Sequence, residues 1–112
     1  MYDVAIIGAG VVGSLIAREF SRFNLSCILL DKENDVACGA TKANTALIHA
    51  GYDASYKSLK GKLNARGNQL YTKLSEELNF PFKRIGSMVL GMLNEDRETI
   101  ERLFENGVKL GI

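Results

Sequence analysis

The N-terminal stretch Asp3-Val-Ala-Ile-Ile-Gly-Ala-Gly-Val-Val-Gly13 decides the fold. The residues from Asp3 to Ile7 are mostly apolar and partly β-branched, which is typical of a short buried strand. The pattern Gly8-x-Gly10-x-x-Gly13 follows at once. Apolar side chains then recur at helical spacing, which predicts a helix from about Val11 to Phe23. A strand, a glycine-rich turn and a helix therefore follow one another directly.

A second apolar run, Ser26 to Leu30, completes this unit and ends at Asp31. We expect Asn24 to end the preceding helix in the left-handed conformation, which Asn tolerates better than most residues. Two strands joined by a helix over about 30 residues form a βαβ unit, whose right-handed crossover makes the strands parallel neighbours. The sequence therefore predicts an α/β fold that begins with a Rossmann-like βαβ unit.

The middle of the chain divides into an irregular segment and a helix. Lys32 to Tyr56 shows little periodicity, and such long segments are more often functional than idle. Ser58 to Asn79 has the pattern of an amphipathic helix that ends at Phe80-Pro81-Phe82. We expect Gly61 and Gly67 to weaken this helix locally and to allow other backbone to approach it. Its apolar stripe comprises Leu59, Leu63, Leu70, Leu74 and Leu78.

The last part of the chain predicts one strand and one helix. Ile85 to Leu93 is apolar and resembles a strand. Asn94 is expected to cap a helix whose first turn holds Glu95 and Asp96, where the helix dipole favours acidic side chains. Asn106-Gly107 is expected to close it. Because a doubly wound sheet needs more strands, we expect the chain to be the N-terminal piece of a longer protein.

Composition excludes several classes of protein. The 112 residues are 46% hydrophobic and 24% charged, and 14 Lys and Arg against 13 Asp and Glu give a net charge of +1. That balance gives no field that favours nucleic acid. We expect the basic residues Lys57, Lys60, Lys62 and Arg66 to form a solvated helix face, the alternative being a phosphate or nucleic-acid patch. The apolar stretch from Val4 to Gly13 is too short to cross a bilayer and lacks signal-peptide features.

The spacing of Cys27 and Cys38 matches no zinc or redox motif, and His49 is the only histidine, so we expect no metal site. Two free thiols in a reducing cytosol are the preferred interpretation, which predicts a cytoplasmic protein.

The glycine pattern predicts a phosphate site. Gly8 permits the tight turn, Gly10 lets backbone approach a pyrophosphate, and Gly13 allows close packing of helix on sheet. The amides at the helix start favour an anion, and Asp31 can accept hydrogen bonds from a ribose diol. Packing alone is the other interpretation of the glycines. Spacing does not distinguish NAD from FAD, because both share the ADP half.

A later segment decides between NAD and FAD. It is Cys38-Gly-Ala-Thr-Lys-Ala-Asn-Thr-Ala-Leu-Ile-His-Ala-Gly-Tyr-Asp53. With the glycine loop and Asp31-Lys32-Glu33, it resembles the flavoproteins of the D-amino-acid oxidase (DAO) superfamily. Within this family, the chain is similar to bacterial FAD-dependent glycerol-3-phosphate dehydrogenases, with L-2-hydroxyglutarate dehydrogenase-like oxidases as near relatives. The resemblance covers essentially the whole chain, and it departs at Asn24, where the family often has glycine.

The resemblance implies FAD as cofactor and assigns residues to it. Thr41, Lys42 and Asn44 match the family's segment beside the pyrophosphate and ribityl chain. His49 matches the turn near the flavin ring and is a candidate proton acceptor, although backbone hydrogen bonds alone could account for it. Thr41 and Asn44 could likewise make only loop hydrogen bonds, and Lys42 could be a solvated charge. The implied cofactor-binding residues are Gly8, Ala9, Gly10, Val12, Gly13, Asp31, Lys32, Thr41, Lys42, Asn44, Ala46 and Leu47.

The resemblance also implies an activity, in which hydride from a secondary alcohol passes to FAD. The expected substrate is glycerol 3-phosphate, and the alternative is a 2-hydroxy acid such as L-2-hydroxyglutarate. An NAD-binding Rossmann module would instead predict regular strands and helices after Asp31. A stand-alone nucleotide-binding module without chemistry is a third alternative.

We expect residues 1–80 to form part of an FAD-binding domain and residues 81–112 to begin a substrate domain. The isolated chain is then expected to be inactive and to self-associate through the unpaired edge near Val4 to Ile7. A longer parent protein could still make peripheral membrane contacts.

Overall fold

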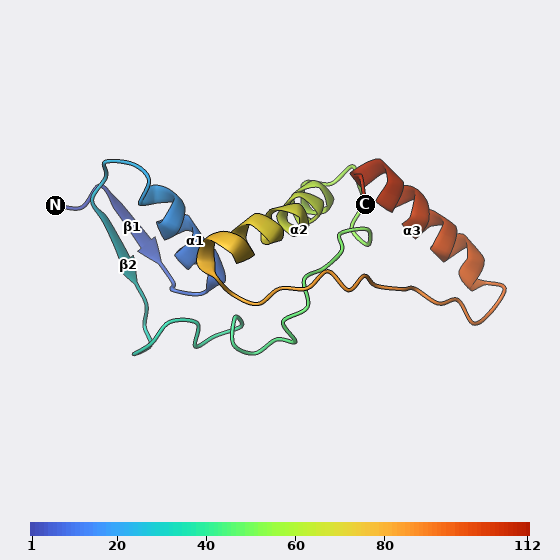
Figure 1. The fold of residues 1–112 in the computed structure, drawn as a ribbon, viewed down its shortest axis with the longest axis horizontal. Coiled ribbons are helices and arrows are strands. Elements are labelled where there is room, and N and C mark those ends of the chain that lie inside the picture. The colour runs from blue at the N-terminus through green and yellow to red at the C-terminus, as the bar shows by residue number, and fades with distance from the viewer. The chain divides into compact units, whose positions relative to one another are not determined.

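Five elements of regular structure occur in the computed structural model, which describes residues 1–112 (Figure 1). The chain divides into two compact units, Met1–Leu47 and Ile48–Ile112. The domain boundary expected after residue 80 is not tested by this division and stays a prediction. None of the helices has the length and apolar character needed to cross a membrane. The elements are β1 (Val4–Ile7), α1 (Val11–Phe20), β2 (Cys27–Leu30), α2 (Leu59–Leu78) and α3 (Asp96–Leu110).

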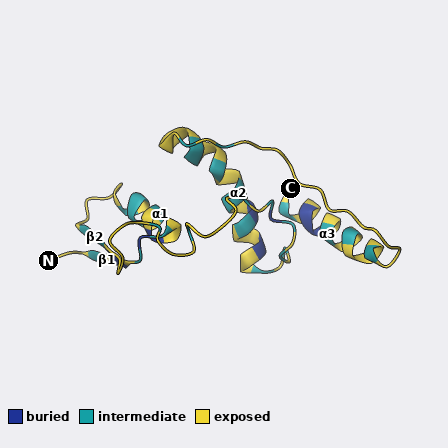
Figure 2. Cartoon of the chain, turned by 90° about the horizontal axis from the view of Figure 1, so that it is seen from below, coloured by how far each residue is buried: buried dark blue, intermediate teal, exposed yellow.

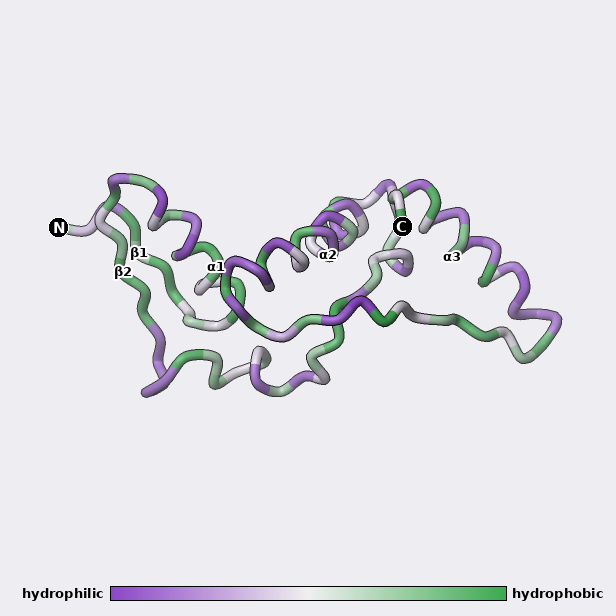
Figure 3. Tube along the Cα trace, viewed as in Figure 1, coloured by the Kyte–Doolittle hydropathy of each residue, from purple (hydrophilic) through white to green (hydrophobic).

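The first unit is the predicted βαβ arrangement. Strands β1 and β2 pair in parallel, with Val4 opposite Cys27 and Ile7 opposite Leu30. Figure 3 shows both strands as largely apolar segments. Ile6 is only 8% exposed, and the buried Gly13 of α1 lies against it. The prediction of an α/β fold with neighbouring parallel strands is therefore confirmed.

Helix α1 ends earlier than expected, and Asn24 does not stop it. The helix ends at Phe20, and Ser21 follows with a right-handed φ of −63°. The amides of Arg22 and Phe23 then bond to the carbonyls of Glu19 and Phe20. These i→i−3 bonds satisfy the last carbonyls, so a left-handed cap is not required. The expectations of a helix to Phe23 and of a left-handed Asn24 were wrong.

In the second unit, α2 has the predicted limits. The Ser58 Oγ caps it by accepting from the Gly61 amide at 3.0 Å, and Asn79 ends it with a left-handed φ of +52°. Gly61 allows the close approach that we expected, because a Cβ there would lie 2.3 Å from the Ser55 carbonyl oxygen. At Gly67, by contrast, a Cβ would meet nothing within 4 Å. Only Gly61 therefore serves packing.

The segment before α3 is not a strand. Ile85 to Leu93 forms no regular structure and pairs with nothing, and the two strands of the structure lie in the other unit. A strand needs a partner for its backbone hydrogen bonds, and this unit supplies none. The Asp96 carboxylate instead accepts from the amides of Met92 and Leu93 at 2.9 and 3.0 Å, which fixes the turn into α3. The predicted strand over Ile85–Leu93 is therefore absent.

Helix α3 extends further than expected, because it does not end at Asn106-Gly107. The helix continues to Leu110, and Gly111 takes the left-handed conformation with a φ of +74°. Asn106 is 7% exposed and is one of the two buried residues of α3, with Gly107. Figure 2 shows that part of α3 is buried, in dark blue. The Asn106 side chain binds a loop of the same unit, so the residue belongs to the core rather than to a terminus.

Candidate functional site

The glycine loop between β1 and α1 has the backbone geometry of a tight strand-to-helix turn. Gly8 has a φ of +101°, and its amide donates to the Leu30 carbonyl at 2.7 Å. A Cβ at Gly13 would lie 1.8 Å from the Gly8 carbonyl oxygen, closer than any real contact. Only glycine therefore fits at Gly13, because α1 starts directly against the loop. Ala9 between them is 4% exposed.

The N-terminus of α1 faces the irregular segment that follows β2. The first amides of a helix have no partner within the helix and attract anions. Gly10, the N-cap, offers no side chain to satisfy them. Thr41 reaches this end, since its Oγ1 accepts from the Val11 amide at 3.0 Å. The Thr41 hydroxyl proton stays available to donate to an acceptor.

A Cβ at Gly10 would lie 3.1 Å from the Thr41 Oγ1, so glycine is what lets Thr41 approach. Thr41, which the family resemblance implies beside the pyrophosphate, is therefore brought to the glycine loop.

Asp31 joins the end of β2 to the glycine loop. Its Oδ2 accepts from the Ala9 amide at 2.6 Å, and its Oδ1 accepts from the Glu33 amide at 2.9 Å. These backbone hydrogen bonds, Glu33 first, hold the pKa of Asp31 below its usual 3.8. The carboxylate is therefore charged at neutral pH and still has lone pairs for a hydroxyl donor. Asp31 both fastens the loop and offers an acceptor beside it.

Changing Asp31 to Asn should weaken the pH dependence of the free energy of unfolding in the acid range. A carboxylate whose pKa is lowered on folding stabilises the protein above its unfolded pKa, near 3.8. That contribution is lost as the pH falls through the lower folded value. Circular dichroism between about pH 5 and pH 1 should show a weaker pH dependence in Asp31→Asn than in the parent. Asp53→Asn, which removes an exposed carboxylate without hydrogen bonds, is the control; an equal effect of both variants would contradict the prediction.

The other implied cofactor residues fall into two groups. Asn44 orders its own turn: its Nδ2 donates to the Thr41 carbonyl at 2.6 Å, and its Oδ1 accepts from the Ala46 amide at 2.7 Å. Ala46 has a left-handed φ of +55° in that turn. The remaining four, Val12, Lys32, Lys42 and Leu47, are exposed.

His49 lies in the second unit, Ile48–Ile112. Its side chain is exposed, and its carbonyl accepts from the Asn68 Nδ2 at 2.8 Å. Its role as proton acceptor stays a prediction.

Two residues that order these segments were missed by sequence reasoning. The Ala37 amide donates to the Ala9 carbonyl at 3.0 Å, with a left-handed φ of +61° at Ala37. An alanine in this conformation has no local sequence signal. Asn106 was interpreted as a helix end, although a polar residue on the apolar face of α3 could have indicated a buried hydrogen bond.

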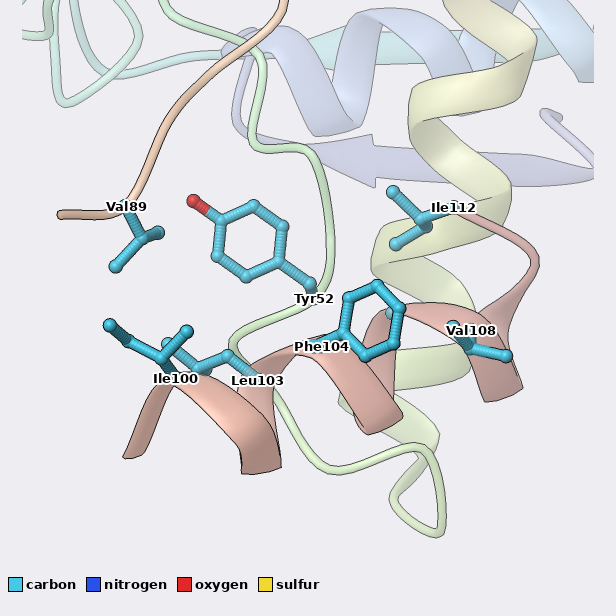
Figure 4. Close-up of a pocket in the computed structure, with 8 residues that line it drawn as sticks. Tyr52, Val89, Ile100, Leu103, Phe104, Val108 and Ile112 are labelled. Carbon is cyan, nitrogen blue, oxygen red and sulfur yellow. The ribbon is translucent and has the colours of Figure 1, made fainter. Parts of the chain in front are cut away.

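The second unit contains an apolar cavity of about 220 Å³ (Figure 4). Side chains of α3 form much of it, and Tyr52 and Val89 come from segments without regular structure. Its lining carries no charged group, and Tyr52 has the only side-chain hydroxyl. No group of His, Cys, Asp or Glu in the chain could hold a metal ion. The lining residues are Tyr52, Val89, Ile100, Leu103, Phe104, Gly107, Val108 and Ile112.

Comparison with known proteins gives concordant matches. The chain is 54% identical over its whole length to a glycerol 3-phosphate dehydrogenase of Caloramator mitchellensis, of which it covers 23%. It is 33% identical to a glycerol 3-phosphate oxidase of Mycoplasma genitalium, covering 98% of the chain and 29% of that protein. It is 31% identical to the mitochondrial L-2-hydroxyglutarate dehydrogenase of Dictyostelium discoideum, covering 100% of the chain and 26% of that protein. The chain therefore spans about a quarter of the length of these curated relatives.

A solved structure matches as well. It is the dithionite-reduced L-α-glycerophosphate oxidase of Mycoplasma pneumoniae with FAD bound, at a TM-score of 0.88 and 31% identity. The match covers 99% of this chain and 29% of that one. Residues 3–112 match the DAO family, described as FAD-dependent oxidoreductases. Taken with the glycine loop, these matches establish that the chain belongs to the DAO family of FAD-dependent oxidoreductases.

Proposed function

We propose that this protein binds FAD and oxidises the secondary alcohol of glycerol 3-phosphate. One observation carries the cofactor: the glycine loop, Thr41 and Asp31 meet at the start of α1. The family membership of residues 3–112 supports the same cofactor. The 54% identical relative is named a glycerol 3-phosphate dehydrogenase, which supports the substrate.

The residues present fit the ADP half of FAD. A pyrophosphate needs backbone amides that it can approach closely, and the start of α1 provides them beside Gly10. The Thr41 hydroxyl has a proton to donate to a phosphate oxygen, and the exposed Lys42 adds positive charge to the same segment. Asp31 supplies the acceptor for a ribose hydroxyl, and its charge disfavours a 2′-phosphate.

In the proposed reaction, bound FAD supplies the acceptor for the hydride. The loop from Gly8 to Gly13 holds the cofactor in place, and Ala46 and Leu47 border it with small and apolar surface. His49 accepts the proton of the substrate hydroxyl, since a neutral imidazole has a ring nitrogen that can take up a proton. The two free thiols, Cys27 and Cys38, support a cytoplasmic location.

An L-2-hydroxy acid is the second candidate substrate, because several relatives are named L-2-hydroxyglutarate dehydrogenases. NAD as cofactor is less well supported. After Asp31 the chain forms no strand or helix until Leu59, whereas a nicotinamide-binding Rossmann domain continues with regular βα units.

The substrate is tested by flavin reduction in the full-length protein. Under anaerobic conditions, we expect glycerol 3-phosphate to bleach the visible flavin absorption, and L-2-hydroxyglutarate to leave it unchanged. The reverse pattern would transfer the proposal to the 2-hydroxy acid. A flavin spectrum that neither compound changes would contradict both substrates.

A further inference from the structure

We propose that Asn68, oriented by Arg84, is a positioning residue that holds the backbone at His49. This inference rests on the proposed function, in which His49 accepts the substrate proton. The contacts that carry it lie within the second unit, on the face of α2 that meets the segment around His49. No hydrogen bond in the structure fixes the His49 side chain itself.

The Asn68 side chain uses both ends of its amide. Its Nδ2 donates to the His49 carbonyl at 2.8 Å, and its Oδ1 accepts from the Arg84 Nη1 at 2.8 Å. An amide group that donates at one end and accepts at the other has a fixed orientation. The chain therefore holds the nitrogen of Asn68 toward His49.

Arg84 is itself fixed by several contacts. Its Nη2 donates to the Asn68 carbonyl at 3.0 Å, and its Nε and Nη2 donate to the Thr72 Oγ1 at 3.0 and 2.9 Å. Its guanidinium lies 5.3 Å from the centroid of the Phe82 ring. Such a planar fork suits two acceptors one helical turn apart, and a lysine would not reproduce it.

The backbone next to His49 packs against the same face of α2. Gly51 is buried with a φ of +108°, and a Cβ there would lie 3.0 Å from the Ala65 Cα. Ala65 and Asn68 are three residues apart, so they share one face of the helix. Close packing at Gly51 and a hydrogen bond at His49 thus fix the segment at two adjacent points.

A two-point attachment limits how far the His49 backbone can move. The rate of proton transfer depends on the distance and angle between the reacting groups. A displacement of about 1 Å lowers this rate by about a hundredfold. If the Asn68 bond is lost, packing at Gly51 still keeps the fold. The expected effect is therefore on the rate of flavin reduction, not on stability or cofactor content.

The test compares Asn68→Asp with Gln69→Glu in the full-length flavoprotein. Asn68→Asp keeps an oxygen for Arg84 but turns an acceptor toward the His49 carbonyl, which removes that bond. Gln69→Glu makes the same change of charge on an exposed residue of α2 without hydrogen bonds. Stopped-flow reduction by glycerol 3-phosphate gives the limiting rate and the half-saturating concentration. Hydrogen exchange of a peptide covering residues 46–52 gives a readout independent of activity.

For Asn68→Asp we expect a limiting rate 10- to 100-fold lower, unchanged half-saturation and flavin content, and faster exchange in 46–52. Arg84→Lys should fall between this variant and the parent, and Gln69→Glu should match the parent. Normal rates and exchange in Asn68→Asp, with a strong defect in His49→Gln, would overturn the positioning role alone. A normal rate in His49→Gln would overturn the proposed role of His49 and this inference with it.

Discussion

Gly13→Ala is expected to destabilise the βαβ unit strongly and, with it, to lower the retention of flavin. The added Cβ would lie 1.8 Å from the Gly8 carbonyl oxygen, and the two nearest atoms belong to the Gly8 backbone, which cannot rotate away as a side chain can. Overpacking costs typically about 1–3 kcal/mol, and a backbone clash of this size falls at or above the upper end. Urea unfolding of the full-length protein and its ratio of flavin to protein measure the effect.

Gly67→Ala is the matched control, because both glycines lie inside helices. At Gly67 a Cβ meets nothing within 4 Å. Alanine is favoured over glycine in a helix by about 1 kcal/mol, so this variant should be more stable than the parent. The two substitutions should therefore have opposite signs. A Gly13→Ala variant with parental stability and full flavin would contradict the loop geometry.

Asn106→Ala is expected to destabilise the second unit by about 3 kcal/mol. Asn106 is 7% exposed; its Oδ1 accepts from the Tyr56 amide at 2.7 Å, and its Nδ2 donates to the carbonyls of Tyr52 and Ala54 at 2.5 and 2.6 Å. Removing the amide leaves three backbone groups in a partly buried place without partners. Thermal unfolding followed by circular dichroism measures the loss.

Glu105→Ala controls for changes on α3, because Glu105 is exposed and makes no hydrogen bond or ion pair. It should shift stability by less than about 0.5 kcal/mol. In the Asn106→Ala variant, hydrogen exchange should also rise first over residues 52–56. A loss of stability no larger than that of Glu105→Ala would contradict the role of Asn106 as the residue that ties this loop to α3.

The elements whose signals are local were predictable from the sequence. The βαβ unit follows from two apolar runs and the glycine turn after the first of them. Each of these signals spans only a few consecutive residues. Ser58 and Asn79 mark the ends of α2 because a side-chain cap and a left-handed residue act within one turn. These features depend on no distant contact.

The errors concern residues whose conformation depends on distant groups. Asn106 followed by glycine is typical of a helix end, but three hydrogen bonds from its side chain to residues 52–56 keep it within α3. Ile85 to Leu93 has the composition of a strand, and strand formation needs a partner that its unit lacks. A local sequence pattern specifies neither the distant partners of Asn106 nor the presence of a neighbouring strand.

At the candidate site, the sequence predicted the types of residue better than their contacts. The glycines and Asp31 were identified from spacing, because only certain residues fit a tight turn and a ribose acceptor. The structure adds that Asp31 also fastens the loop through the Ala9 amide, and that Thr41 caps α1 through the Val11 amide. Those bonds join residues 22 and 30 positions apart, and no spacing rule predicts them.

Cofactor binding by the full-length protein tests the central claim most directly. The protein, stripped of cofactor, is titrated with FAD while flavin fluorescence is followed, and NAD is then added as competitor. We expect saturation at one FAD per chain, a visible flavin spectrum for the complex, and no displacement by NAD. A protein that binds NAD and cannot be loaded with FAD would contradict the claim that the glycine loop, Thr41 and Asp31 form an FAD site.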